Sequence, residues 1–317
     1  MNTIRVGVIG VGHLGFHHAR VYSGLDGVQL VGVVDSDIDR ALKASAEFDA
    51  PMFAACEELL AEGVDAVSVV VPTSAPREVA LQCIEAGADV LVEKPIAATI
   101  DEAVAIVEAA RRRGRLVQVG HIERFNGAVV ALMQAVKEPR FIECHRLSPY
   151  PNRGDDVSVV LDLMIHDLEI VLALVGGAVV QVDAIGVPVF SKFEDIANAR
   201  IRFDTGCVAN ITSSRVSMEK MRKIRIFAND AYVSTDYSAQ EVIVYRKKPM
   251  ELTPDITPME LIDIEPLNVH KEEPLKRELE SFVACVRERK RPLVSGDDAL
   301  AALRLAHQVI DSIREHT

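Results

Sequence analysis

Three glycines near the amino terminus have the spacing of a phosphate-binding loop. The run Gly10-Val11-Gly12-His13-Leu14-Gly15 follows a short segment rich in Val and Ile and precedes an amphipathic stretch. In such a loop the first glycine permits a tight turn, the second lets the backbone approach a pyrophosphate, and the third lets a helix pack close to a strand. The phosphate oxygens then bind the amide groups of the helix amino terminus. The run, with His13 and Leu14, therefore predicts a dinucleotide-binding site.

An acidic residue follows this loop at the distance that dinucleotide binding requires. Asp35 ends the second apolar segment, 20 positions after Gly15. A carboxylate there accepts hydrogen bonds from the adenosine ribose hydroxyls and repels a 2′-phosphate, which favours NAD over NADP. Arg40 follows about one helical turn later, and this arginine keeps NADP from being excluded as the cofactor. The alternative interpretation is a tight turn followed by a solvated aspartate.

Two further groups of polar residues could act on a bound substrate. Lys94 lies in Glu93-Lys94-Pro95, after a predicted strand, at the edge where open α/β sheets bind their ligands. From the residues alone, a surface lysine paired with Glu93 is the more ordinary interpretation. Asp162 and His166 lie four positions apart in an apolar run, so a helix would place both on one face. Buried Asp and His are costly without partners, and a structural hydrogen-bonded pair is the alternative.

The pattern of the chain predicts the elements that must position these residues. Apolar segments alternate with amphipathic stretches, which is typical of βα units around a parallel sheet. Strands are expected at residues 4–9, 28–34, 66–71, 90–92 and 116–119, and helices at 13–23, 37–48, 76–86 and 100–112. Thr99 and Glu102 form a capping box for the last of these helices.

The later part of the chain has a different pattern. Between residues 141 and 246 seven short alternating strands are separated by turn signals, which favours an antiparallel sheet. Residues 249–273 are expected to form a loop or arm, and two helices with apolar stripes follow. The predicted fold class is α/β: a Rossmann domain with a doubly wound parallel sheet at 1–122, and an α+β domain with an open, mainly antiparallel sheet at 123–317. The carboxyl-terminal helices are expected to pack back on the Rossmann domain.

Composition excludes several classes of protein. The 317 residues are 49% apolar and 26% charged, which indicates a folded protein of about two domains. A net charge of −12 disfavours nucleic acid and anionic membranes as partners. The five cysteines are widely spaced, which predicts neither disulfides nor a metal site. No apolar run reaches the roughly 18 residues of a membrane span, so a cytoplasmic location is expected.

The Glu93-Lys94-Pro95 and Asp162-to-His166 patterns resemble those of the Gfo/Idh/MocA family, the glucose–fructose oxidoreductase and inositol dehydrogenase group. The chain end, including Ser295-Gly296-Asp297-Asp298, is also similar to the closing helices of that family. Most members oxidise a sugar or cyclitol hydroxyl group with NAD(P).

The resemblance implies a role for each of these residues. His166 is the general base, and Asp162 orients the substrate hydroxyl or holds His166 and Lys94 in place. Lys94 stabilises the forming alkoxide. Asp167 and Glu169, by contrast, are interpreted as ordinary helix charges.

One loop departs from the family pattern. Where members commonly have Pro-x-x-x-His after the third strand, this chain has Pro76 in place of the histidine. Pro72 and Thr73 remain candidate cofactor contacts together with Glu93 and Lys94, and the departure puts only local loop contacts in doubt.

Two segments are similar to the subgroup that acts on UDP-linked N-acetylated sugars, particularly UDP-N-acetylglucosamine 3-dehydrogenases. They are residues 119–126 and 146–154. Arg124, Arg146 and Arg153 have the forked guanidinium that suits phosphate oxygens, and Asn126 could pair with an acetamido or hydroxyl group. The ordinary alternative is a solvated helix start and a loop arginine.

The prediction is therefore NAD-dependent oxidation of a UDP-sugar hydroxyl, most simply the 3-hydroxyl of UDP-N-acetylglucosamine. Two alternatives stay open: a dehydrogenase of free sugars or inositol, and a non-catalytic NAD-binding sensor of the same fold. Strands such as residues 208–213 alternate apolar with small polar side chains, which is compatible with contacts between sheets. A homodimer or homotetramer is expected.

Overall fold

The computed structural model describes residues 3–72, 76–150, 157–250 and 257–316, with the side chain of residue 258 excepted. The chain divides into two compact units. Unit 1 comprises Met1–Ile122 and Glu273–Leu303, and unit 2 comprises Glu123–Glu272 and Arg304–Thr317. The second division falls inside the last helix, α9 (Gly296–Glu315). That residues 1–122 and 123–317 form separate folding domains stays a prediction.

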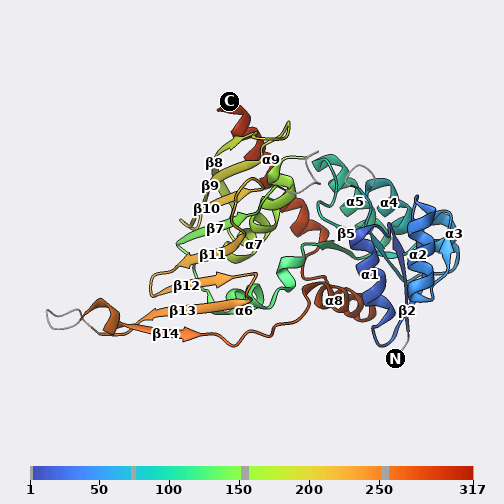
Figure 1. Cartoon of the computed structure of the whole chain (residues 1–317), viewed down its shortest axis with the longest axis horizontal. Helices are drawn as coiled ribbons and strands as arrows, with labels where there is room; N and C mark the ends of the chain where they lie inside the picture. Colours follow the sequence, from blue (N-terminus) through green and yellow to red (C-terminus); the bar gives the residue numbers. More distant parts are fainter. Residues whose placement is uncertain (1–2, 73–75, 151–156, 251–256, 317) are drawn as a thin grey trace. The chain divides into compact units, whose positions relative to one another are not determined.

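Unit 1 is a Rossmann fold, as the sequence predicted. Its six parallel strands lie in the order β3-β2-β1-β4-β5-β6, with helices packed against the sheet (Figure 1). The strands are β1 (Ile4–Ile9), β2 (Val28–Val34), β3 (Met52–Phe53), β4 (Ala66–Val69), β5 (Asp89–Glu93) and β6 (Val117–Gly120). The helices are α1 (His13–Ser23), α2 (Ile38–Phe48), α3 (Cys56–Ala61), α4 (Pro76–Glu85), α5 (Ile100–Arg113) and α8 (Pro274–Glu288). The short β3 and α3 were not predicted from the sequence.

The apolar stripe of α8 completes the core of unit 1. Leu279 and Phe282 are fully buried in the same cluster as Val6 and Val8 of β1 and Tyr22 of α1. Burying a side chain of this size stabilises the fold by about 1.5–3 kcal/mol. The interpretation of the stripe as core packing is therefore confirmed.

Helix caps in unit 1 follow the sequence closely. The Thr99 hydroxyl accepts from the amide of Glu102, and the Glu102 carboxylate accepts from the amide of Thr99, so the predicted capping box is present. Ser295 and Asp298 form the corresponding reciprocal pair at the start of α9. Because capping needs only residues three positions apart, the sequence is sufficient to find it.

Unit 2 is built on an eight-stranded sheet in the order β14-β13-β12-β11-β7-β10-β9-β8. Every neighbouring pair is antiparallel except β7 and β10, so the predicted mainly antiparallel sheet is confirmed. The strands are β7 (Phe141–Leu147), β8 (Val179–Val187), β9 (Ile196–Phe203), β10 (Val208–Ser214), β11 (Met221–Phe227), β12 (Ala231–Asp236), β13 (Glu241–Lys247) and β14 (Ile262–Pro266).

Helices cover one face of this sheet. Helix α7 (Ile165–Val175) and the π-helical turn η2 (Val160–Met164) before it lie against β10, and α6 (Gly127–Ala135) lies against β12 and β13 (Figure 1). The 3-10 turn η1 (Ile122–Phe125) precedes α6. Strand β9 alternates between buried residues on the helix side and exposed residues such as Asn198, Arg200 and Arg202 on the other. The face opposite the helices, here called the polar face, carries these polar side chains at β9 and the aromatic side chains of Phe227, Tyr232 and Tyr245 at β11 to β13.

Two local features of unit 2 differ from what the sequence predicted. The arm at residues 249–273 contains the turn η3 (Pro258–Leu261) and the strand β14, which pairs with β13 and extends the sheet. Pairing with β13 satisfies backbone groups that would otherwise stay exposed. A composition rich in Pro and acidic residues does not reveal such pairing. The segment with Asp162 is π-helical rather than α-helical. In the described part of the chain, no helix is long and apolar enough to cross a membrane.

Candidate active site

The glycine loop has the geometry that a pyrophosphate needs. Gly10 has φ +87°, and a Cβ atom there would lie 2.2 Å from the carbonyl oxygen of Val70. A Cβ on Gly15 would lie 1.8 Å from the carbonyl oxygen of Gly10. Any L side chain at either position would therefore force the loop apart. His13 and Leu14 are exposed in the first turn of α1, with Gly12 as its amino-terminal cap.

Asp35 is fixed beside this loop by two backbone amides. Its Oδ2 accepts a hydrogen bond of 2.7 Å from the amide of Val11, and its Oδ1 accepts one of 2.9 Å from the amide of Asp37. Each carboxylate oxygen has a second lone pair that a ribose hydroxyl can use. Arg40 pairs with Asp37 at 3.2 Å, and its Nη1 lies 3.8 Å from the place of a Cβ on Gly12. The residues present fit the adenosine half of a dinucleotide.

The end of β5 positions Glu93 and Lys94. The Glu93 Oε1 lies 3.1 Å from Nε2 of the buried His18, and its Oε2 accepts a hydrogen bond of 3.3 Å from the amide of Lys94. Glu93 and Lys94 are half-buried. Pro72 is exposed beyond the end of β4, and Thr73 lies outside the described residues. Unit 1 therefore brings the loop, Asp35 and the strand end of Lys94 to the carboxyl edge of one parallel sheet.

Asp162 and His166 lie on consecutive segments of unit 2. Asp162 is half-buried in the π-helical turn, and His166 is buried in the first turn of α7. A π-helical turn is energetically unfavourable and is often found where a protein needs a side chain at a set position. The residues from Ile165 to Val171 are all buried, as the apolar run predicted.

The arginines proposed as phosphate ligands are engaged inside unit 2. Arg146 donates two hydrogen bonds to the Asp167 carboxylate, at 2.8 and 2.9 Å, and a third to Glu123 at 2.9 Å. Arg124 pairs with Glu169 at 2.6 Å. All these side chains are at least nine-tenths buried.

This network corrects two expectations. Glu123 and Arg124 do not form a solvated helix start. Asp167 and Glu169 are not ordinary helix charges, since the arginines neutralise them in the interior. The signal that could have revealed this is the apolar run, because a carboxylate in a helix buried all round needs a cationic partner.

Asn126 also has a structural role that the sequence analysis missed. Its Oδ1 accepts from the amide of Ala128 at 3.0 Å, which caps α6, and its amide nitrogen donates to the carbonyl oxygen of Tyr237 at 3.2 Å and to Glu123 at 3.3 Å. Arg153 lies outside the described residues. Contact of Arg124, Asn126 or Arg153 with a substrate stays a prediction.

Electrostatics within the network support its tight pairing. Burial alone would lower the pKa of Arg146, but the neighbouring Asp167 and Glu123 carboxylates hold that pKa well above its ordinary value. Burial raises the pKa of the nearby Tyr237 hydroxyl, with Asp167 as the second cause. Arg146 therefore stays charged and Tyr237 stays neutral at neutral pH, which suits a rigid scaffold rather than proton transfer.

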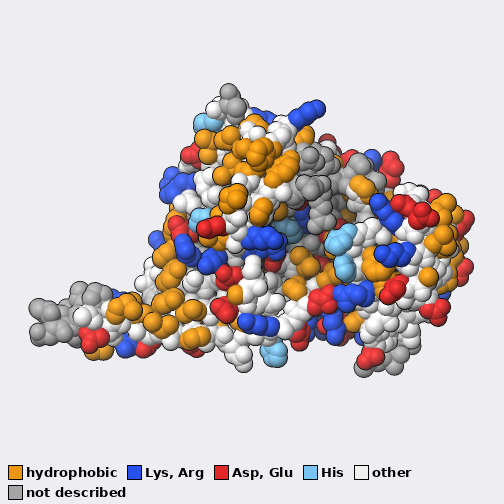
Figure 2. All heavy atoms as spheres, in the orientation of Figure 1, with side chains coloured by type: hydrophobic (Ala, Val, Ile, Leu, Met, Phe, Trp, Pro, Cys, Tyr) orange, Lys and Arg blue, Asp and Glu red, His pale blue; other side chains and the backbone are white. Residues whose placement is uncertain are grey.

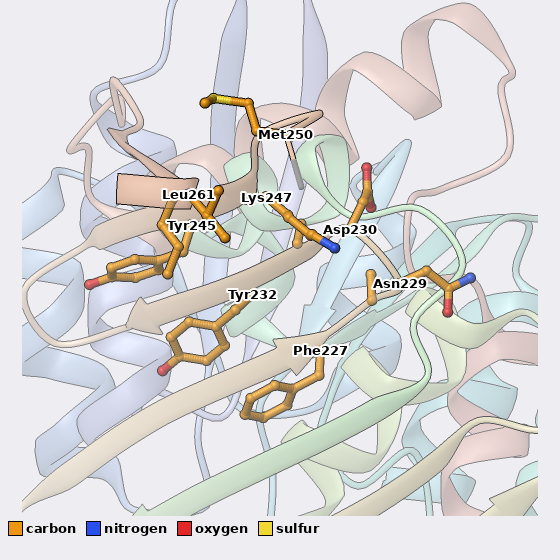
Figure 3. Close-up of a pocket in the computed structure, with 11 residues that line it drawn as sticks. Phe227, Asn229, Asp230, Tyr232, Tyr245, Lys247, Met250 and Leu261 are labelled. Carbon is orange, nitrogen blue, oxygen red and sulfur yellow. The ribbon is translucent and has the colours of Figure 1, made fainter. Parts of the chain in front are cut away.

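A separate hollow lies on the polar face of the sheet. Its volume is about 740 Å³, and it is lined by aromatic and aliphatic side chains from β11 to β14 (Figure 3). Phe227, Tyr232 and Tyr245 follow one another across three strands, with ring centroids 4.8 and 5.1 Å apart. No cluster of three potential metal ligands occurs among the residues that the structure describes. The hollow is also lined by Asp230 and Lys247, but by none of the residues to which the sequence analysis gave a catalytic or binding role, so it is not the candidate active site.

Comparisons with known proteins identify the family. Residues 4–121 match the model of an oxidoreductase family with an NAD-binding Rossmann fold, GFO/IDH/MocA, and residues 127–234 match the GFO/IDH/MocA carboxyl-terminal domain. UDP-N-acetylglucosamine 3-dehydrogenase from Acidithiobacillus ferrooxidans is 37% identical over 96% of both chains. The chain belongs to the GFO/IDH/MocA family.

Other comparisons agree with this membership. A crystal form of the A. ferrooxidans enzyme, GnnA, has a TM-score of 0.92 with 36% identity, covering 99% of each chain. The scyllo-inositol 2-dehydrogenase (NAD(+)) of Bacillus subtilis is 25% identical over 98% of this chain and 94% of its own. The protein described by the present structure is therefore an oxidoreductase with an NAD(P)-binding domain.

Proposed function

We propose that this protein uses NAD to oxidise a hydroxyl group of a UDP-sugar to a ketone, most simply the 3-hydroxyl of UDP-N-acetylglucosamine. The observation that carries the proposal is the 37% identity to UDP-N-acetylglucosamine 3-dehydrogenase over 96% of both chains. A match over 96% of the chain includes residues of both unit 1 and unit 2. Asp35, anchored beside the glycine loop, favours NAD over NADP because a 2′-phosphate would meet a carboxylate.

The proposed mechanism gives one task to each of three side chains. His166 accepts the proton of the substrate hydroxyl, since a neutral imidazole is a suitable base near neutral pH. The Lys94 ammonium stabilises the negative charge that develops on that oxygen. Asp162 orients the hydroxyl or holds the other two side chains. Bound NAD supplies the acceptor for the two electrons and the hydrogen that leave carbon, and the carbon–oxygen bond becomes a carbonyl.

Recognition of the UDP group is a separate part of the proposal. Arg124 has one guanidinium nitrogen paired with Glu169, and an arginine carries five N–H donors, so further donors exist for a phosphate oxygen. We propose that Arg124 and Arg153 contact the pyrophosphate. Asn126 uses both ends of its amide in unit 2, so we propose that its contribution to substrate binding is made chiefly by fixing α6.

The test is turnover with a panel of substrates. The protein is incubated with NAD and UDP-N-acetylglucosamine, other UDP-sugars, free sugars or inositols, and reduced nicotinamide is followed by absorbance. The UDP-sugar product should have lost two hydrogen atoms by mass spectrometry. Lys94→Met and His166→Ala should each lower kcat by about 10²–10⁴-fold. Lys290→Met, which removes an exposed lysine, is the matched control and should retain full activity.

Two other results would replace this proposal. Oxidation of free inositols but not of UDP-sugars would favour an inositol dehydrogenase, the activity named for the B. subtilis relative. Tight NAD binding without turnover of any member of the panel would favour a sensor of the same fold.

We also propose that the polar face of the sheet in unit 2 pairs with a second copy of the chain, giving a homodimer or homotetramer. The face carries charges of both signs, such as Arg225 and Glu143, and the aromatic row from Phe227 to Tyr245. Exposed apolar side chains gather on the β13–β14 arm, including Met250, Met259 and Ile264 (Figure 2). Such mixed, self-complementary surfaces suit a two-fold interface. Light scattering should give a mass of at least twice 34.7 kDa, and Tyr232→Glu should lower it.

A further inference from the structure

A chain of buried polar side chains runs through unit 1 and ends at Glu93. The Tyr22 hydroxyl lies 2.8 Å from the Ser68 hydroxyl, which lies 3.2 Å from Nδ1 of His18. The other ring nitrogen of His18, Nε2, lies 3.1 Å from the Glu93 carboxylate. Tyr22, Ser68 and His18 are completely buried. None of these three residues has a task in the proposed mechanism.

The hydrogen-bonding capacities of these groups define a consistent arrangement. A neutral His18 with its hydrogen on Nε2 donates to Glu93 and accepts at Nδ1. Ser68 then donates to Nδ1, and Tyr22 donates to the Ser68 oxygen. Every donor in the chain is satisfied in this way. Burial raises the pKa of Tyr22, so its hydroxyl keeps its proton and remains a donor. The Glu93 carboxylate only accepts, so it requires the hydrogen of His18 on Nε2, and Ser68 completes the arrangement by donating to Nδ1.

Glu93 is held tightly at the other end of this chain. Its second oxygen accepts from the amide of Lys94, and a Cβ on Gly120 of β6 would lie 2.6 Å from the carboxyl carbon. Besides the adjacent Lys94, the titratable groups near the carboxylate in the described part of unit 1 include His18 and Tyr22 of α1 and Glu278 of α8. Only His18 of these three donates a hydrogen bond to Glu93.

We propose that His18 is a positioning residue for Lys94 and that it acts through Glu93. By donating to Glu93, His18 anchors the carboxylate inside unit 1, and the ammonium of the next residue stays directed at the substrate oxygen. This inference rests on the proposed function, because Lys94 is given its catalytic task there. His18 thus orients Glu93 and the Lys94 ammonium. It is not a catalytic residue, because it is buried and contacts no reacting atom.

Loss of the His18 donor has a definite electrostatic consequence. A half-buried carboxylate that loses a hydrogen bond attracts the nearest cation more strongly. The ammonium of Lys94 belongs to the adjacent residue, so it is drawn toward Glu93. An opposite charge at close range favours the protonated amine, so in a variant without the His18 donor the pKa of Lys94 should rise. The same movement takes the ammonium away from the alcohol.

Three variants and one control test this inference in the full-length protein. His18→Leu removes both ring nitrogens, and Ser68→Ala keeps the ring but removes the hydrogen bond that holds it at Nδ1. Both should lower kcat by about tenfold with little change in KM for the sugar or in Kd for NAD. His18→Gln retains an N–H near the Nε2 position and should restore most of kcat. Tyr22→Phe disturbs the same buried chain away from Glu93, and its kcat should stay near that of the wild type.

A measurement that needs no turnover separates this inference from the proposed function. Lysines labelled with ¹³C-methyl groups are titrated by NMR, and the Lys94 signal is assigned by its loss in Lys94→Arg. The Lys94 pKa should rise in His18→Leu and Ser68→Ala but not in Tyr22→Phe. That pattern supports the positioning role even if no UDP-sugar is oxidised. An unchanged Lys94 pKa in both His18→Leu and Ser68→Ala, or an equal change in Tyr22→Phe, overturns it, whether or not the protein is active.

Discussion

Glu278 makes the stability of this protein depend on pH in a way that one substitution should remove. Its side chain is fully buried in α8, and neither carboxyl oxygen accepts or donates a hydrogen bond among the described residues. Burial, and to a smaller extent the nearby Glu93, raises the pKa of Glu278 well above its ordinary value. The group is therefore a neutral acid in the folded state over a wide pH range.

The sign of the effect follows from proton binding in the two states. In the unfolded chain a glutamate has a pKa of about 4.3. Between that pH and the raised pKa in the fold, the folded state binds one proton more than the unfolded state. The free energy of unfolding therefore falls as pH rises, by about 1.4 kcal/mol per pH unit. Glu278→Gln keeps a neutral group of the same shape and has no such slope.

Between pH 5 and pH 7 the free energy of unfolding of the wild type should therefore fall, relative to that of Glu278→Gln, by as much as about 2.7 kcal/mol. Urea unfolding at several pH values, followed by circular dichroism, measures this difference. Glu280→Gln on the same helix is the matched control, because Glu280 is only partly buried and is paired with Lys276. It should differ from the wild type by less than about 0.5 kcal/mol at every pH. Parallel pH dependences for the wild type and Glu278→Gln would refute the assignment of a neutral buried acid.

Three further substitutions test other parts of the structure. Asp35→Ala should lower kcat/KM for NAD by about 10–100-fold and improve NADP relative to NAD, measured by steady-state kinetics with both cofactors, since it removes hydrogen bonds of a charged acceptor. Arg146→Met should lower the free energy of unfolding by about 3–5 kcal/mol in urea, because it leaves Asp167 buried without its cation; Arg146→Met combined with Asp167→Leu should recover part of the loss. Thr99→Ala should lower the free energy of unfolding by about 1 kcal/mol, because the cap of α5 is lost. An unchanged free energy of unfolding would contradict the capping box.

The site was predictable from sequence to the extent that it depends on local spacing. The glycine loop, Asp35 and Lys94 all follow strands whose apolar character is plain in the sequence, and the structure has those strands within two residues of their predicted ends. The carboxyl ends of parallel strands meet at one edge of a sheet, so three separate motifs could be assigned to the same edge before any coordinates were known.

The charges in unit 2 could not be assigned in this way. Arg146 and Asp167 are 21 positions apart, and Arg124 and Glu169 are 45 apart. A sequence shows that each is ionisable but does not show which segments pack together. Their burial therefore changed the interpretation of Asp167 and Glu169 from helix charges to partners in a buried network.

The sequence by itself determined most of the elements, the caps and the family resemblance of this protein, because periodicity and short motifs act over a few residues. Tertiary structure alone decided that β14 joins the sheet, that Asp162 lies in a π-helical turn, and that His18 reaches Glu93 across 75 positions. The physical reason is that burial and hydrogen bonding depend on neighbours in space, and for a polar side chain those neighbours determine its charge, its orientation and its role.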